Sequence, residues 1–183
     1  MRSLDSSRGK LLLHTCCGPC ATHVIELLSR EYQVTAFFYN PNISPEEEYR
    51  TRLTEVEKLC ALNGTELLAG PYEPQKWIER TGDFKDEPEG GKRCELCFAL
   101  RLEETARYAV DHGFALFATT LTISPHKDAR LINRIGQETG REYGVQFLEG
   151  DFKKEDGYRK SCELSRQYGL YRQNYCGCLF SKK

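Results

Sequence analysis

Nine cysteines carry most of the chemistry that this sequence can offer. Seven of them form three short groups, namely Cys16-Cys17-Cys20, Cys94-Cys97 and Cys176-Cys178. Thiolates bind iron–sulfur clusters and structural zinc, and a pair of thiols can also store two electrons that it releases on closing to a disulfide. The two solitary cysteines, Cys60 and Cys162, lie in helix-like segments, where we expect them to pack as small apolar side chains.

The first cysteine group follows a short apolar run. Lys10 to His14 reads as a buried strand, Gly18-Pro19 as a tight turn, and Cys20 to Arg30 as a helix. In a parallel α/β sheet such a turn lies at the carboxyl end of the strand, where ligands bind. The sequence therefore predicts three thiols at the mouth of a site, in preference to three cysteines that merely pack in the core.

Cys94 and Cys97 form a C-x-x-C pair at a predicted loop-to-helix boundary, where free N–H groups and the helix dipole stabilise thiolates. Together with Cys16 and Cys17, this pair would supply the four thiolates of a [4Fe–4S] cluster. A structural zinc site could use the same four residues. Because two to four residues usually separate paired zinc ligands, the adjacent Cys16 and Cys17 favour iron–sulfur.

Cys176 and Cys178 flank Gly177 in a tail that the sequence indicates to be flexible. A disulfide across one residue would be strained and easily reduced, and such bonds tend to be redox-active rather than structural. The alternative is that the pair supplies extra metal ligands. Cys20 then remains as a seventh thiol, which would ligate a second metal or act as a proton donor or nucleophile beside the cluster.

Other polar groups are expected near the same mouth. His14 ends the first strand, and a lone histidine in that place is more often structural than a ligand. The stretch Ser124-Pro125-His126-Lys127 follows the fourth predicted strand. Its hydroxyl and Lys127 would suit a ribose or a phosphate, but a helix cap explains Ser124 equally well. The roles of His14, Ser124, His126 and Lys127 stay open.

Basic and aromatic residues interleave in the last third of the chain. The first part of the run contains Phe152, Lys153, Lys154, Tyr158, Arg159 and Lys160. The second part contains Tyr168, Tyr171, Arg172 and Tyr175, together with the amide side chains of Gln173 and Asn174. This composition suits an RNA loop whose bases are splayed out and stacked, so we expect one RNA-facing surface around the cluster. A solvated helix face explains the charges equally well.

Strand-like and helix-like segments alternate along the chain. Strands are predicted at Lys10 to His14, Gln33 to Tyr39, Thr65 to Ala69, Phe114 to Thr119 and Val145 to Leu148. Helices are predicted at Cys20 to Arg30, Pro45 to Leu62 with Ser44 as cap, Gln75 to Arg80, Cys97 to His112, Asp128 to Thr139 ended by Gly140, and Asp156 to Tyr168. This alternation predicts a single α/β domain over residues 1–183 with a mostly parallel sheet of about five strands. We expect a mobile loop from Thr81 to Lys92 and loose ends at 1–9 and 179–183.

Composition narrows the class of protein. The net charge of −1 argues against a generally basic nucleic-acid binder, so any such contact must come from a local patch. No apolar run approaches the roughly 18 residues of a membrane span, and the first residues lack the apolar core of a signal peptide, so we expect a cytoplasmic protein without membrane contact. In that reducing compartment, clustered cysteines are more often metal-binding or catalytic than structural. The glycine motifs of ATP and dinucleotide binding are missing.

Four motifs together resemble one known family. They are His14-Thr15-Cys16-Cys17-Gly18-Pro19-Cys20, the Cys94/Cys97 pair, Thr119-Thr120-Leu121 with Ser124-Pro125, and Leu170-Tyr171-Arg172-Gln173-Asn174-Tyr175-Cys176-Gly177-Cys178. From about Leu11 to Ser181, the chain resembles QueH, a family of epoxyqueuosine reductases. The C-C-G-P-C and Y-R-Q-N-Y-C-G-C motifs are specific, whereas the middle motifs would be weak alone.

The resemblance implies a [4Fe–4S] enzyme with a Rossmann-like, nucleotide-hydrolase-like fold that reduces epoxyqueuosine to queuosine in tRNA, the last step of queuosine synthesis. It places the cluster ligands at Cys16, Cys17, Cys94 and Cys97 and the redox-active pair at Cys176 and Cys178. It also implies an additional iron ion, for which Cys20 is the leading candidate ligand. The partners would be the anticodon loop of a tRNA carrying epoxyqueuosine and an unidentified electron donor.

The alternative from a different class is a zinc-stabilised RNA-binding module without catalysis. An iron–sulfur protein is brown because of charge transfer between sulfur and iron, whereas zinc has a filled d shell and gives no colour. Colour and metal content would therefore separate the two hypotheses.

Overall fold

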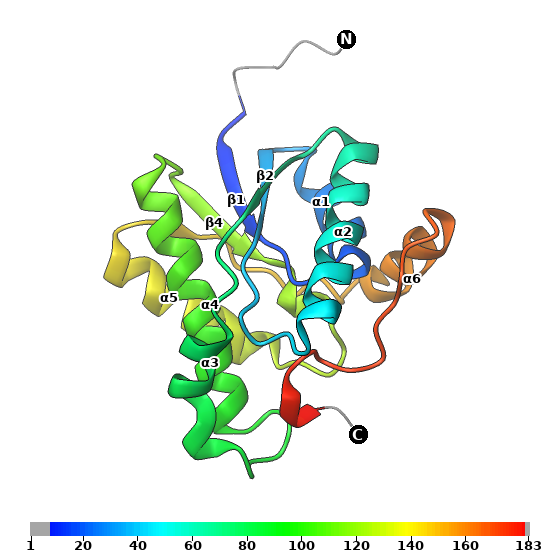
Figure 1. Ribbon diagram of the computed structural model, residues 1–183. Helices are drawn as coiled ribbons and strands as arrows, with labels where there is room; N and C mark the ends of the chain where they lie inside the picture. Colours follow the sequence, from blue (N-terminus) through cyan, green and yellow to red (C-terminus); the bar gives the residue numbers. More distant parts are fainter. Residues whose placement is uncertain (1–7, 182–183) are drawn as a thin grey trace.

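The computed structural model describes residues 8–181 and contains a five-stranded parallel sheet between two layers of helices (Figure 1). The strand order is β3-β2-β1-β4-β5, with β1 at Lys10–His14, β2 at Gln33–Phe38, β3 at Glu66–Ala69, β4 at Leu116–Thr119 and β5 at Gln146–Phe147. The chain extends the sheet from β1 in one direction and then from β4 in the other. β1 and β4 therefore flank the switch point at which ligands bind in such folds. The predicted α/β class is confirmed.

Helices cover both faces of the sheet. One layer contains α1 (Gly18–Leu28), α2 (Glu46–Asn63) and α6 (Gly157–Gln167), and the other contains α3 (Pro74–Thr81), α4 (Lys92–Asp111) and α5 (Ala129–Tyr143). On β1, Leu11 and Leu13 pack into the first layer and Leu12 into the second, because successive strand side chains point to opposite faces. Within residues 8–181, no helix combines the length and hydropathy needed to cross a bilayer.

The first two helices start differently from the sequence-based expectation. α1 begins at Gly18 rather than at Cys20, because Cys17 is its N-cap and the Sγ of Cys17 accepts the Cys20 N–H at 3.4 Å. α2 has Pro45 at the cap position without a side-chain cap bond, so Ser44 is not its cap. The cap of α1 thus places a thiol at a helix N-terminus.

α4 begins at Lys92, before both residues of the C-x-x-C pair, whereas the sequence indicates a helix from Cys97. The preceding segment includes a short 3₁₀ turn at Gly82–Phe84. Arg93 is buried and donates hydrogen bonds to the carbonyls of Phe84 and Lys85, which ties this segment to the start of the helix. Its mobility stays a prediction.

α5 continues through Gly140, where the sequence indicates an end, and stops at Gly144, whose φ of 74° lies in the left-handed region. Gly140 serves close packing instead. A Cβ at Gly140 would lie 2.6 Å from the carbonyl oxygen of Val145, so only glycine lets the backbones approach. The other predicted element ends agree with the structure to within two residues.

Parts of the two chain ends that we expect to be loose are attached to the fold. The Gln33 N–H donates to the carbonyl of Gly9 at 3.0 Å. Leu179–Ser181 forms a 3₁₀ turn, and the ring of Phe180 lies 5.8 Å from that of Trp77. Residues 1–7 and 182–183 lie outside the described part of the chain.

Candidate metal centre

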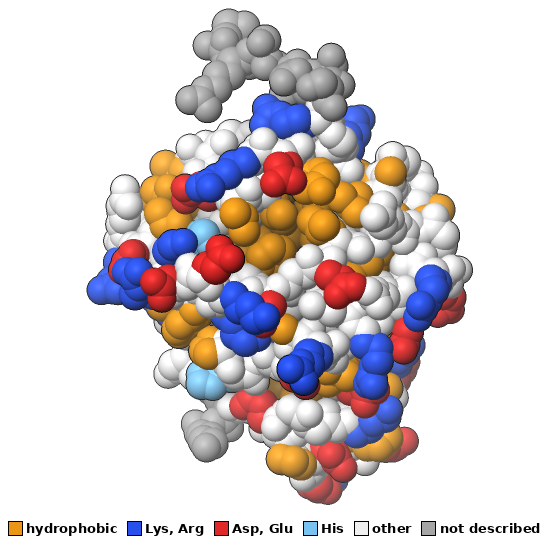
Figure 2. Space-filling view, turned by 180° about the vertical axis from the view of Figure 1, so that it is seen from behind, with side chains coloured by type: hydrophobic (Ala, Val, Ile, Leu, Met, Phe, Trp, Pro, Cys, Tyr) orange, Lys and Arg blue, Asp and Glu red, His pale blue; other side chains and the backbone are white. Residues whose placement is uncertain are grey.

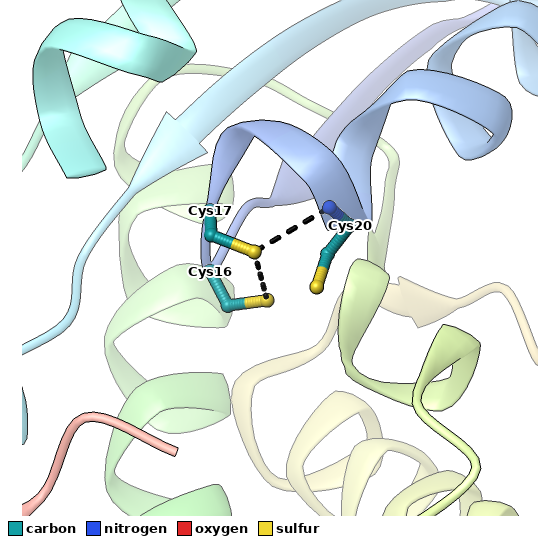
Figure 3. Close-up of side chains that lie close together, drawn as sticks. All are labelled: Cys16, Cys17 and Cys20. Carbon is teal, nitrogen blue, oxygen red and sulfur yellow. Dashed lines mark hydrogen bonds between the residues drawn. The ribbon is translucent and has the colours of Figure 1, made fainter. Parts of the chain in front are cut away.

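Cys16, Cys17 and Cys20 converge at the carboxyl end of β1, and their sulfurs point toward one another (Figure 3). The three Sγ atoms lie within 4.8 Å of one another, and those of Cys16 and Cys17 are 3.9 Å apart. In the described part of the chain, this is the one group of three or more His, Cys, Asp or Glu side chains placed to share a metal ion. The Cys16 N–H donates to Thr120 Oγ1 at 3.2 Å, which joins the turn to the end of β4.

The three thiols hold their protons unequally. Hydrogen bonds from Cys17 and Cys20 hold the pKa of Cys16 well below its usual value. Burial opposes this shift, and the charges of Arg101 and Lys127 support it. Burial raises the pKa of Cys17 to about 12, and hydrogen bonds to its two neighbours raise the pKa of Cys20. Without metal the group therefore carries its thiolate on Cys16, and metal binding must displace protons from the other two.

Cys94 and Cys97 lie near the start of α4, outside this group. The Sγ of Cys94 accepts the Gly90 N–H at 3.2 Å. Cys97 is buried beside Trp77 and Cys178, and burial raises the pKa of Cys97 to about 11. Ligation of one cluster by these two cysteines together with Cys16 and Cys17 stays a prediction.

Arg101 connects the two cysteine groups electrostatically. Its side chain is fully buried, with Nη2 donating to Asn40 Oδ1 at 2.7 Å and Nη1 lying 4.0 Å from the Sγ of Cys97. Its charge helps to lower the pKa of Cys16 and opposes the rise that burial causes in the pKa of Cys97. Arg101 is not among the residues that the sequence singles out, although its place four residues after Cys97 puts both on one helix face.

The C-terminal tail is docked on α2. Arg52 is buried and donates to the carbonyl oxygens of Tyr175 and Cys176 at 3.2 and 3.0 Å. The carbonyl of Gly177 accepts the Ser44 N–H at 2.8 Å. Gly177 has a φ of 115°, and a Cβ there would lie 2.9 Å from Nη1 of Arg52, so only glycine fits. These contacts hold a segment that the sequence indicates to be flexible, and its two cysteines are free thiols.

A cavity of about 590 Å³ opens at this end of the sheet. Cys16, Cys20 and Cys176 all line it, so the first cysteine group and the tail face the same space. The stretch from Ser124 to Lys127 lines it too, as the sequence predicts. Burial would lower the pKa of Lys127, but negative charge on the nearby cysteines raises it overall, so this lysine keeps its proton.

Local contacts explain His14, whereas Ser124 does not have the capping role that the sequence allows. Nδ1 of His14 lies 2.8 Å from Thr119 Oγ1, and Nε2 lies 3.2 Å from the carbonyl of Tyr39. Burial lowers the pKa of His14 to about 3, so the ring is neutral and both nitrogens are engaged in structural contacts. Asp128 caps α5, so the cap explanation does not apply to Ser124.

The two solitary cysteines stay apart from the candidate site. Cys60 is buried in the apolar core, and burial raises its pKa to about 11. Cys162 is half-buried on α6, which packs against α1. Both positions agree with the expectation that these cysteines pack rather than bind metal.

The basic and aromatic run divides between the cavity and the outer surface. The members that line the cavity are Tyr158, Arg172, Gln173, Asn174 and Tyr175. Elsewhere Nζ of Lys153 lies 2.7 Å from Oδ1 of Asp151, and Arg159 forms ion pairs with Asp156 and Glu163. On the face shown in Figure 2, Lys and Arg alternate with Asp and Glu. Apart from Tyr158 on α6, the members of the run that line the cavity all lie on the tail.

Comparison with known proteins shows the family to which the chain with this cysteine-lined cavity belongs. Residues 11–183 match the family model described as epoxyqueuosine reductase QueH. The chain belongs to the QueH family. A relative from Streptococcus pyogenes serotype M1 named epoxyqueuosine reductase QueH is 40% identical over 98% of this chain and 72% of its own length. A QueH of the same description from Thermotoga maritima is 41% identical over 94% of this chain and 90% of its own.

These matches confirm the expected resemblance to QueH and the expected function: the chain is an epoxyqueuosine reductase, an oxidoreductase that reduces epoxyqueuosine in tRNA. They do not favour the zinc-stabilised RNA-binding module, because the QueH relatives are named as reductases.

Two solved structures share the fold. One is described as a predicted subunit of tRNA methyltransferase from Methanocaldococcus jannaschii, with a TM-score of 0.56, 14% identity, and coverage of 84% of this chain and 76% of that one. The other is the U34-tRNA thiolase NcsA from Methanococcus maripaludis with its [4Fe-4S] cluster, with a TM-score of 0.56, 14% identity, and coverage of 96% and 61%. Identity this low shows the Rossmann-like fold alone.

Proposed function

We propose that this epoxyqueuosine reductase works with a [4Fe–4S] cluster held by Cys16, Cys17, Cys94 and Cys97. The observation that carries the proposal is the convergence of Cys16, Cys17 and Cys20 at the switch point of a QueH-family protein. The modified base of the tRNA anticodon loop would enter the cavity that these thiols line.

The donor set fits an iron–sulfur cluster. Thiolate sulfur is the soft ligand that such clusters require. Each of the four sulfurs already has a donor: Thr120 for Cys16 at 3.4 Å, the Cys20 N–H for Cys17 at 3.4 Å, the Gly90 N–H for Cys94 at 3.2 Å and Arg101 for Cys97 at 4.0 Å. These donors stabilise the negative charge that ligand thiolates carry. When bound, the cluster would supply electrons one at a time.

Removal of the epoxide oxygen consumes two electrons and two protons and leaves an alkene and water. Lys127 lines the cavity and keeps its proton, so we place it beside the departing oxygen. Cys20 faces the same cavity next to Cys16 and Cys17, and it would act as a proton donor or nucleophile or hold an additional iron ion.

Cys176 and Cys178 would supply the two electrons together. Closing the dithiol to a disulfide releases two electrons and two protons, which equals the demand of the reaction. Cys176 lines the cavity and Cys178 packs beside Cys97, so the pair extends from the substrate space to α4. The electron donor that reduces the disulfide again is unidentified.

Turnover of modified tRNA tests this function. Protein reconstituted anaerobically with iron and sulfide should convert epoxyqueuosine to queuosine in the presence of a chemical reductant, as measured by mass spectrometry of the tRNA nucleosides. Protein loaded with zinc should bind the tRNA without converting it. A colourless protein that takes up zinc alone and never converts the nucleoside would contradict the proposal and favour the RNA-binding module.

A further inference from the structure

Gln173 connects the C-terminal tail to the first cysteine group. Its Nε2 donates a hydrogen bond to the Sγ of Cys17 at 2.9 Å, although the two residues are 156 positions apart. The other donors to the four proposed ligand sulfurs lie at 3.2 to 4.0 Å. Gln173 thus makes the closest of these contacts among the described residues.

The orientation of the Gln173 amide suits a sulfur that is bound to metal. A metal-bound thiolate has no proton, so it accepts hydrogen bonds and cannot donate them. The donor end of the amide faces Cys17. The other end, Oε1, is buried and has no hydrogen-bond partner in the described part of the chain, so the contact with sulfur is what fixes the amide.

The tail is held on both sides of Gln173. Before it, Nη1 of Arg172 donates to Ser165 Oγ at 2.9 Å. After it, Arg52 donates to the carbonyl of Tyr175. The amide therefore reaches Cys17 from a backbone that other contacts hold in place.

We propose that Gln173 is a positioning residue that raises the reduction potential of the cluster through Cys17. The inference rests on the proposed function, since it takes Cys17 to be a cluster ligand. A hydrogen bond to a ligand sulfur stabilises negative charge, and reduction adds negative charge to the cluster, so the bond favours the reduced form. Because Cys176 lies on the same tail as Gln173, the docked tail would place both residues beside the cluster.

Potentiometric titration of reconstituted variants, followed by visible absorption and electron paramagnetic resonance, tests this role. Gln173→Leu removes the donor and keeps a side chain of similar size. Its midpoint potential should be more negative than that of the wild type. Gln173→Glu replaces the donor nitrogen with a carboxylate oxygen and should shift the potential in the same direction. Gln167→Leu makes the same change at an exposed position of α6 and should leave the potential unchanged.

A wild-type potential in Gln173→Leu, or an equal shift in Gln167→Leu, would overturn the role of Gln173. If Gln173→Leu takes up no cluster, Gln173→Glu decides: a more negative potential supports the role, and a wild-type potential overturns it. Loss of the cluster from both variants would assign Gln173 to assembly and overturn the tuning role. Failure of the wild-type protein to take up iron and sulfide would instead overturn the proposed cofactor on which the inference rests.

Discussion

At the scale of single residues, contacts with Arg52 and Ser44 hold the backbone around the two tail cysteines. Arg52 binds the carbonyl of Cys176, and the carbonyl of Gly177 accepts the N–H of Ser44. The backbone between Cys176 and Cys178 is therefore fixed while both thiols remain free. The proposed redox role requires the two sulfurs to reach each other on this held backbone.

A Cys176→Ser or Cys178→Ser variant should keep the four-iron cluster yet lose turnover, because the two-electron source is removed while the proposed ligands remain. Cys162→Ser, a change on α6 outside the cysteine groups, should keep both the cluster and turnover. Thiol trapping of the wild-type protein should count two fewer free thiols after oxidation than after reduction. Normal turnover in the Cys176→Ser variant, or a thiol count that does not follow the redox state, would rule out the redox role.

At the scale of elements, the alternation of strands and helices follows from local sequence patterns. The first or last residues of several helices do not follow from them. The sequence places Gly140 after α5 because glycine commonly ends helices. In the structure, Gly140 lies inside the helix. The carbonyl oxygen of Val145 occupies the space that a side chain at this position would take, so the glycine serves packing. The early start of α4 at Lys92 depends on Arg93, which binds carbonyls that precede the helix. Such contacts exist only after the chain has folded, so local propensity cannot reveal them.

Gly140→Ala should lower the free energy of unfolding by about 1–3 kcal/mol, the usual effect of an overpacked contact. The new Cβ would lie 2.6 Å from a backbone oxygen, which cannot rotate away. Urea denaturation of the metal-free protein measures the change.

Gly82→Ala is the matched control for this substitution. Gly82 has helical backbone angles, and a Cβ there would have nothing within 4 Å. Alanine at this position should stabilise the fold by about 0.4–1 kcal/mol, since it restricts the unfolded chain. Shifts of the same sign in both variants would contradict the packing explanation.

At the scale of the whole molecule, the sheet order decides which distant segments meet. The three thiols after β1 could be placed from sequence, because strand, turn and helix are adjacent in the chain. The contact of Gln173 with Cys17 and the hydrogen bond of Arg101 to Asn40 could not, because these partners are far apart in the sequence and meet only in the folded chain. The sequence therefore identified the chemical groups and one cluster of them, and the topology supplied their surroundings.

Replacing Lys153, Lys154 and Lys160 together by alanine should weaken tRNA binding and reduce its dependence on salt concentration, because fewer phosphate contacts release fewer counterions. For three lost contacts, the negative slope of log affinity against log salt concentration should become shallower by about 2–3. Affinity measured at several salt concentrations gives this slope.

The control is a triple variant with the same loss of charge at the opposite end of the sheet, where the residues are Arg8, Lys10 and Arg30. These three side chains are exposed and lie away from the cavity. Their replacement should leave affinity and slope unchanged. Equal behaviour of the two triple variants would show that the lysines belong to a solvated face and do not bind RNA.

The most direct measurement of the central claim is the iron and sulfide content of four single serine variants after anaerobic reconstitution. The variants are Cys16→Ser, Cys17→Ser, Cys94→Ser and Cys97→Ser, with Cys162→Ser as the control of equal chemistry. The account predicts that the wild type and the control take up a full [4Fe–4S] cluster and that each of the four variants falls well below it. A full cluster in any two of the four variants would contradict the assignment.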